Sequence, residues 1–323
     1  MILRSFSRWI RLACLAVGVA AASRGRAEDV LLQWKLQPGQ ALHQHMETRT
    51  KTTTQVGGNR LEGTQNMEID FLWTVGKVGE DRKAGVTQKV QRIRLKMKMP
   101  GSGELEYDSD EGKDLPGPVG TIMGPMLKAL VGAELTFQMT PDGKVDNVKV
   151  PDSLTAAASK LRGGGAGVMF GEEAFRQMCQ PFPTFPDKPV GVGATWSDSK
   201  KVDLPFGGAI RTANKYVYEG PEERGGRRLL KFSVKGDVTH EKPEKVTVEL
   251  NVKPKDSSGL IFFDPELGHF VEMASRQDIA MQMAFGGQRT ENESQTSLTW
   301  KIEDATKPAA GDGAGGKAQP TTK

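Results

Sequence analysis

The feature that most constrains this chain is a strict alternation of apolar and polar residues over several long segments. In the clearest example, Met67 to Val75, every second residue is apolar and nearly all of the residues between are polar. A period of two is that of a β-strand with one buried face. The pattern recurs in Leu42–Val56, in Val86–Met99 and repeatedly from Ala194 to Ile302. The sequence therefore predicts long antiparallel strands, which must curve to bury one face.

One of these segments changes its phase. Val86 and Val90 share one parity, whereas Ile93, Leu95 and Met97 share the other. An extra residue in the strand restores the alternation, so we expect a β-bulge near Gln91 or Arg92.

A short hairpin lies near the middle of the chain, in Glu134–Leu154. Leu135, Phe137 and Met139 alternate with polar residues, and Pro141-Asp142-Gly143 is a turn sequence. In the return strand Val145 and Val148 are three residues apart, which predicts a bulge or a short strand. Asp152 or Ser153 is the expected N-cap of the helix that follows.

Helical spacing is confined to the segment around this hairpin. Apolar residues recur with a helical period in Val119–Leu130, where Gly124-Pro125 predicts a kink or a helix that begins at Pro125. Two further helices are expected at Asp152–Leu161, ended by Gly163–Gly165, and at Glu172–Gln180. A proline-rich connector follows, in which Phe182 and Phe185 are the expected anchors. Short strands are also expected at Val30–Leu36 and at Leu260–Phe263.

These elements define a mainly β (β-rich α+β) fold class. We predict long antiparallel curved sheets, half-barrel or sandwich-like, with a small central helical insert over 119–180. The predicted organisation is a signal peptide at 1–27, one β-rich domain at 28–304 and a disordered tail at 305–323. Alternatively, the domain divides into two β halves, 28–150 and 190–304. A helical and proline-rich segment at 151–189 joins them.

The first residues predict the compartment. Arg4, Arg8 and Arg11 form a basic n-region, Leu12–Ala22 is apolar, and cleavage is expected after Ala27. This apolar run is short for a membrane-spanning helix. We therefore expect an exported protein of the periplasm, the cell envelope or the extracellular space, without a transmembrane segment after cleavage.

Removal of this segment changes the charge balance and the cysteine count. Residues 1–27 hold five of the 44 Lys and Arg residues and no acid, which leaves 39 basic against 40 acidic residues. Net charge then gives no support for nucleic-acid binding, which needs a clustered basic face. Cys179 is the single cysteine left, so no intramolecular disulfide is expected, and its apolar neighbours predict a buried thiol.

Motifs that carry chemistry are weak in this sequence. His43, His45 and Glu47 share one strand face, as metal ligands can, but Arg49 and Lys51 continue that face and oppose cation binding. The glycines of 163–167 follow a helix rather than a strand and lack the Gly-Lys-Ser/Thr of a phosphate loop. We predict no metal site, no cofactor and no catalytic residue, hence not an enzyme.

Four turn-and-anchor motifs carry a family resemblance. They are Leu32–Gly39, Thr140–Val145, Pro189–Trp196 and Gly259–Gly268, in that order. Together they resemble an uncharacterised family of exported β-rich proteins, domains of unknown function common in planctomycete-type bacteria. The resemblance covers most of residues 30–303 and implies an envelope or secreted protein with no assigned activity.

Two functional hypotheses follow. In the first, a non-catalytic exported envelope protein binds a lipid-like or other apolar ligand between curved sheet and helices, through Met123, Met126, Phe137, Met281 and Phe285. In the second, a structural or partner-binding envelope protein has a filled core and no ligand. The sequence leaves the identity of the ligand or protein partner and the oligomeric state open.

Overall fold

The computed structural model describes residues 29–99, 103–161, 171–180, 182–203, 208–242, 249–285 and 288–305. The predicted signal peptide, the glycines of 163–167 and nearly all of the predicted tail lie outside these residues. Among the described residues, 64% lie in strands and the helices are small, so the protein is mainly β, as the alternation predicts.

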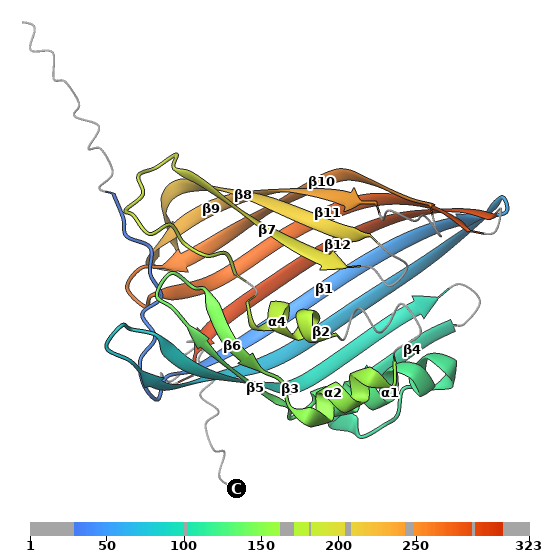
Figure 1. Cartoon of the computed structure of the whole chain (residues 1–323), viewed down its shortest axis with the longest axis horizontal. Helices are drawn as coiled ribbons and strands as arrows, with labels where there is room; N and C mark the ends of the chain where they lie inside the picture. Colours follow the sequence, from blue (N-terminus) through green and yellow to red (C-terminus); the bar gives the residue numbers. More distant parts are fainter. Residues whose placement is uncertain are drawn as a thin grey trace, which may run out of the picture.

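The strands are long and follow one another closely along the chain (Figure 1). Their bounds are β1 Ala41–Val56, β2 Asn59–Val78, β3 Ala84–Met99, β4 Gly103–Asp108, β5 Glu134–Met139, β6 Val145–Lys149, β7 Thr195–Asp203, β8 Ala209–Arg224, β9 Arg227–Glu241, β10 Glu249–Asp264, β11 His269–Phe285 and β12 Gln288–Asp304. The described helices are η1 Ser109–Glu111, α1 Gly117–Leu130, α2 Asp152–Ser159 and α4 Glu172–Cys179.

All twelve strands belong to one antiparallel, curved and unclosed sheet. Its order is β6-β5-β3-β2-β1-β12-β11-β10-β9-β8-β7, and β4 pairs with β3 beside this path. The first and last long strands, β1 and β12, pair from Leu42↔Asp304 to Val56↔Thr290, so both β runs of the sequence enter the same sheet. Of the two predicted arrangements, the half-barrel describes this sheet.

Local details of the strands follow the sequence pattern. Between β2 and β3 the register shifts where Asp70↔Arg92 is followed by Phe71↔Val90, which leaves Gln91 as the extra residue. The bulge predicted from the change of phase is therefore confirmed. The return strand β6 is five residues long, and its register also shifts against β5, as the spacing of its valines predicts.

Three sequence predictions were wrong. Val30–Leu36 is not a strand: apart from one bridge, Val30↔Val190, it crosses the end of the sheet as an extended segment. Its backbone bonds to separate loops, from Trp34 N to Pro141 O and from Lys35 N to Gly268 O. Leu260–Phe263 is part of the sixteen-residue β10.

The third error concerns the start of α2. Its N-cap is Pro151, which makes no side-chain hydrogen bond, so neither Asp152 nor Ser153 caps it. Asp152 lies instead in the first turn, where its carboxylate still interacts favourably with the helix dipole.

The helices lie on one side of the sheet. In Figure 1, α4 lies in front of the central strands, and α1 and α2 lie together beside β3 and β4. Helix α1 begins at Gly117 and continues through Pro125, rather than beginning there. No described helix has the length and apolar character needed to cross a membrane.

An aromatic cluster fills the inner face at one end of the sheet. Trp34, from the extended N-terminal segment, contacts Trp73, Phe182 and Phe270, with ring centroids 5.3–6.0 Å apart. Phe182 also stacks on Phe270 at 4.8 Å, and Phe185 meets Phe263 at 5.1 Å. The two predicted anchors of the proline-rich connector are thus confirmed. We call this end of the sheet the closed half.

Candidate functional site

In the other half of the inner face, Trp196 stacks on Tyr216 at the wall formed by β7 and β8, with ring centroids 5.6 Å apart. This half extends from Met46 along β1 toward the turn at Gly57-Gly58, where Figure 1 shows the long β1–β2 hairpin reaching its tip. We call this part of the inner face the trough. The residues of its central floor are hydroxyl-bearing and alternate with outward-facing neighbours; they are Thr48, Thr50, Thr52 and Thr54 of β1 and Ser294 and Thr296 of β12.

The first hollow of the trough lies over β8 to β12 and has a volume of about 320 Å³. Its lining includes Val234, Met273 and Leu298 from the sheet and Phe182 and Pro183 from the connector. Apolar side chains thus bound this hollow from the sheet below and from the edge of the aromatic cluster.

The second hollow, of about 240 Å³, lies over β1, β2 and β3. It is lined by Thr50, Thr52 and Thr54 and by the apolar Leu61, Met97 and Met99. The two hollows adjoin on the floor, because Thr296 lines the first, Thr50 lines the second, and their hydroxyls bond to each other at 3.2 Å.

The floor is polar but uncharged. Thr54 donates a hydrogen bond to Asn292 Oδ1 at 2.6 Å, and this pair is two cross-strand pairs beyond Thr52 and Ser294. Each hydroxyl has one donor and two acceptor positions, so these pairs leave hydrogen-bonding capacity directed into the trough.

The wall formed by β7 and β8 carries two charged residues, Asp198 and Lys200, beside the trough. Tyr216 donates to Asp198 Oδ2 at 2.9 Å and Asn214 donates to Asp198 Oδ1 at 3.1 Å. Lys200, which lines the first hollow, donates to the carbonyl of Gln180 at 3.0 Å. Burial, reinforced by the Asp198 carboxylate, raises the pKa of Tyr216, so this phenol keeps its proton and acts as a neutral donor.

Of the five residues predicted to contact an apolar ligand, the four whose side chains the structure describes do not come together. Met126 and Phe137 are buried in the core, and Phe137 packs edge-on against Trp73 in the closed half. Met123 is partly buried against the same core. Met281 lies at the far end of the inner face, paired with Asn292, and the side chain of Phe285 lies outside the described residues. Of the five, Met281 alone is placed by the structure on the trough.

The hydroxyl floor was missed as a site, although its signal is in the sequence. The even positions of Leu42–Val56 are uncharged throughout, whereas the odd positions include Glu47, Arg49 and Lys51. A half-buried strand with threonines rather than aliphatic residues on its inward face indicates an inner surface that the core does not fill.

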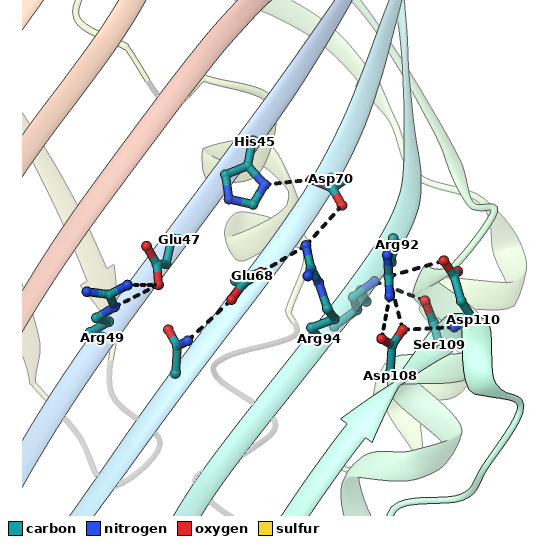
Figure 2. Close-up of polar contacts among 12 residues, drawn as sticks. His45, Glu47, Arg49, Glu68, Asp70, Arg92, Arg94, Asp108, Ser109 and Asp110 are labelled. Carbon is teal, nitrogen blue, oxygen red and sulfur yellow. Dashed lines mark hydrogen bonds and ion pairs between the residues drawn. The ribbon is translucent and has the colours of Figure 1, made fainter. Parts of the chain in front are cut away.

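His43, His45 and Glu47 lie on the opposite, outer face of β1, as their parity predicts. Figure 2 shows His45 and Glu47 on this face. His45 Nδ1 is 2.6 Å from Asp70 Oδ1, and Glu47 pairs with Arg49. In the part of the chain that the structure describes, no three His, Cys, Asp or Glu side chains are grouped so that they could hold a metal ion.

A second cluster on the outer face surrounds the bulge in β3. Arg92 binds Asp108 through both Nε, at 3.0 Å, and Nη2, at 2.5 Å, and also contacts Asp110 at 3.1 Å (Figure 2). The hydrogen bonds from Arg92 hold the pKa of Asp108 below its usual value. Arg94 pairs with Glu68 at 2.9 Å. The outer face is therefore a solvated surface of cross-strand ion pairs.

These ion pairs also border a hollow of about 460 Å³ on the outer face, next to His43 and His45. Asp70, Asp110 and Glu303 oppose Arg92 and Lys301 around it. Because the two signs are interleaved, this hollow presents no field of one sign to a charged ligand.

Comparison with known proteins finds a match to one family model. Residues 81–259, more than half of the chain, match the model of DUF6263, which is described as a family of unknown function. The predicted resemblance to an uncharacterised domain family is confirmed to that extent, while the bacterial group and export stay predictions. No curated protein matches the sequence.

Several solved structures match with low TM-scores. The structure described as lipid-protein interactions in lipovitellin has a TM-score of 0.40 and 14% identity, over 86% of this chain and 26% of that chain. An outer membrane channel from Pseudomonas putida F1 has a TM-score of 0.23 and 8% identity, over 84% of this chain and 97% of that chain. The translocator domain of the autotransporter NalP from Neisseria meningitidis has a TM-score of 0.19 and 8% identity, over 83% of this chain and 89% of that chain. This chain spans about a quarter of the lipovitellin chain.

Proposed function

We propose that this chain, which belongs to the family DUF6263, is a non-catalytic exported protein that binds an apolar ligand in its trough. The observation that carries the proposal is the pair of adjoining hollows on the inner face, which are lined by apolar side chains together with a few polar groups. A site that is concave, mostly apolar and equipped with a few polar groups is typical of small-molecule binding.

The polar groups of the molecule support a non-catalytic role. On the inner wall, the Asp198 carboxylate accepts hydrogen bonds from Tyr216 and Asn214, and the raised pKa of Tyr216 keeps it protonated. A general base needs a lone pair within reach of its substrate and a pKa near the working pH. The outer-face cluster of Arg92 and Asp108 is engaged in ion pairs instead.

Binding is tested by titration with N-phenyl-1-naphthylamine, a neutral dye that fluoresces in apolar surroundings. Leu298→Trp adds bulk to the lining of the first hollow and is expected to weaken dye binding by about tenfold or more, a loss of about 1.4 kcal/mol. Ser297→Trp is the matched control, because Ser297 is its exposed neighbour on the outer face. Equal binding by the two variants, with unchanged melting temperatures, would contradict a site in the trough.

Export is tested separately. The basic residues before Leu12–Ala22 and the expected cleavage after Ala27 support it. Protein recovered from the envelope or the medium should begin at Glu28 by intact mass and N-terminal sequencing. A chain that retains Met1 and stays in the cytoplasm would contradict export.

The closed half supports the alternative, a structural or partner-binding envelope protein with a filled core. There the aromatic cluster around Trp34 and Phe182 leaves the inner face filled. This alternative predicts that the wild-type protein takes up no dye in the titration above, and that Leu298→Trp changes nothing.

A further inference from the structure

The trough separates charge from hydroxyl groups more strictly than apolar binding requires. Along β1, the outward positions Glu47, Arg49 and Lys51 are charged, whereas the inward positions from Met46 to Thr54 are uncharged. The same division holds for β12, where Glu291, Glu293 and Lys301 face outward. We infer that the trough selects an uncharged amphiphile with a hydroxylated head group, of the monoacylglycerol kind; this rests on the proposed function.

The absence of floor charges argues against a charged head group. Within the trough, neither the inward residues of β1 from Met46 to Thr54 and of β12 from Thr290 to Trp300 nor their neighbours on β2, β3 and β11 include Lys, Arg, Asp or Glu. A carboxylate or ammonium group placed there would lose water without gaining a counter-ion, which costs far more than burying a hydroxyl that finds a partner. Arg276 and Lys98 also border the hollows, but both stand at outward positions, and Arg276 pairs there with Asp278 at 2.9 Å.

The two charged residues on the inner wall do not change this balance. Lys200 and Asp198 have opposite formal charges and lie on the same strand, β7. Asp198 is bound by Tyr216 and Asn214, and Lys200 is bound by the carbonyl of Gln180. Together they add no net charge to the wall.

The floor supplies the groups that a hydroxylated head needs. The hydroxyls of Thr48, Thr52 and Ser294 form no hydrogen bond with another described residue, so they can exchange hydrogen bonds with a ligand. On either side of the floor, neighbouring strands carry thioether and aliphatic groups, which adapt to the shape of an acyl chain. Near Thr52 these are Met99 on one side and Ile279 on the other.

The selectivity is measured by displacement of N-phenyl-1-naphthylamine with three probes that share one dodecyl chain length. They are dodecanoylglycerol, dodecanoate and dodecyltrimethylammonium, each below its micelle concentration and at a pH of about 8, where the carboxylate is ionised. We expect dodecanoylglycerol to displace the dye at concentrations about tenfold lower than either charged probe, equivalent to about 1.4 kcal/mol. Dodecanoate binding as tightly as the glyceride would overturn the inference while leaving the proposed function intact. Failure of the dye itself to bind would contradict the proposed function.

A charge placed on the floor tests the position of the head group. Thr52→Lys should raise the affinity for dodecanoate by about tenfold relative to dodecanoylglycerol, because it supplies the missing counter-ion. Thr53→Lys is the matched control, since Thr53 is the next residue of β1 and faces outward between Glu62 and Glu293. If the order of the probes is the same in Thr52→Lys as in the wild type, the head group does not lie on this floor and the inference fails. Circular dichroism of both variants establishes that the sheet is intact.

Discussion

Replacement of Phe182 by alanine tests how the connector after α4 is held on the sheet. Phe182 is 4% exposed and contacts Trp34, Phe270 and Trp300, with ring centroids 6.0, 4.8 and 5.5 Å away. Removing a buried aromatic side chain costs about 3–5 kcal/mol, through lost burial and the cavity left behind. Each ring pair contributes about 0.5–1.5 kcal/mol of this. We therefore expect Phe182→Ala to lose about 3–5 kcal/mol of unfolding free energy.

The assay is equilibrium unfolding in urea, followed by far-UV circular dichroism. With a slope of about 3 kcal/mol per molar urea, the loss moves the midpoint down by about 1 to 1.7 M. Leu260→Ala is the control, because Leu260 is 39% exposed on the outer face and should change the stability by about 0.5 kcal/mol or less. A loss of less than about 1 kcal/mol in Phe182→Ala would refute the packing described for the connector.

Three further predictions concern titratable groups. Arg92 lowers the pKa of Asp108 in the folded protein, so this ion pair stabilises the fold at pH values above 3.8, the pKa of the unfolded carboxyl group. The stabilisation is lost as the pH falls through the lower, folded pKa. Arg92→Ala should therefore flatten the acid part of a plot of unfolding free energy against pH. Burial lowers the pKa of His269 in the folded protein, so the unfolded chain binds this proton more tightly, and the unfolding free energy should decrease as the pH falls below about 6.5. His269→Gln should remove this decrease. His43→Gln, at an exposed position, should leave it unchanged. Burial raises the pKa of Cys179 to about 12, so iodoacetamide should label this thiol in urea but not in the folded protein.

The sequence predicted individual strands well, because each long strand has one inward and one outward face. Even the bulge at Gln91 could be predicted, since a change of phase in the alternation has few other physical causes. The order of strands could not be predicted. The pairing of β1 with β12 joins residues more than 200 positions apart, and nothing in either segment identifies its neighbour.

The segment around Trp34 shows where alternation misleads. Leu32 and Trp34 are buried and their neighbours are more exposed, which is the pattern of a strand. The alternation arises here because an extended chain crosses the end of the aromatic cluster, and one side of it packs against that cluster. Alternating burial alone does not distinguish such an extended segment from a strand of a sheet, because a strand also requires backbone hydrogen bonds to a neighbouring strand.

The trough was predicted only in part. Methionine is an ambiguous signal for such a site: Met126 belongs to the core, because methionine fills irregular gaps in cores as readily as it lines open sites. The uncharged inward positions of β1 were the more informative signal. Their meaning depended on knowing that β12 places Ser294 and Thr296 beside them, which is information about the pairing of distant strands.

Native mass spectrometry of the protein purified without detergent from its own cells is the most direct test of the central claim, that the trough binds an apolar ligand. We predict an added mass that organic extraction releases as an uncharged, hydroxylated lipid, and its loss from the Leu298→Trp variant but not from the Ser297→Trp variant. A wild-type protein that carries no added mass, and acquires none when dodecanoylglycerol is supplied, would contradict the claim.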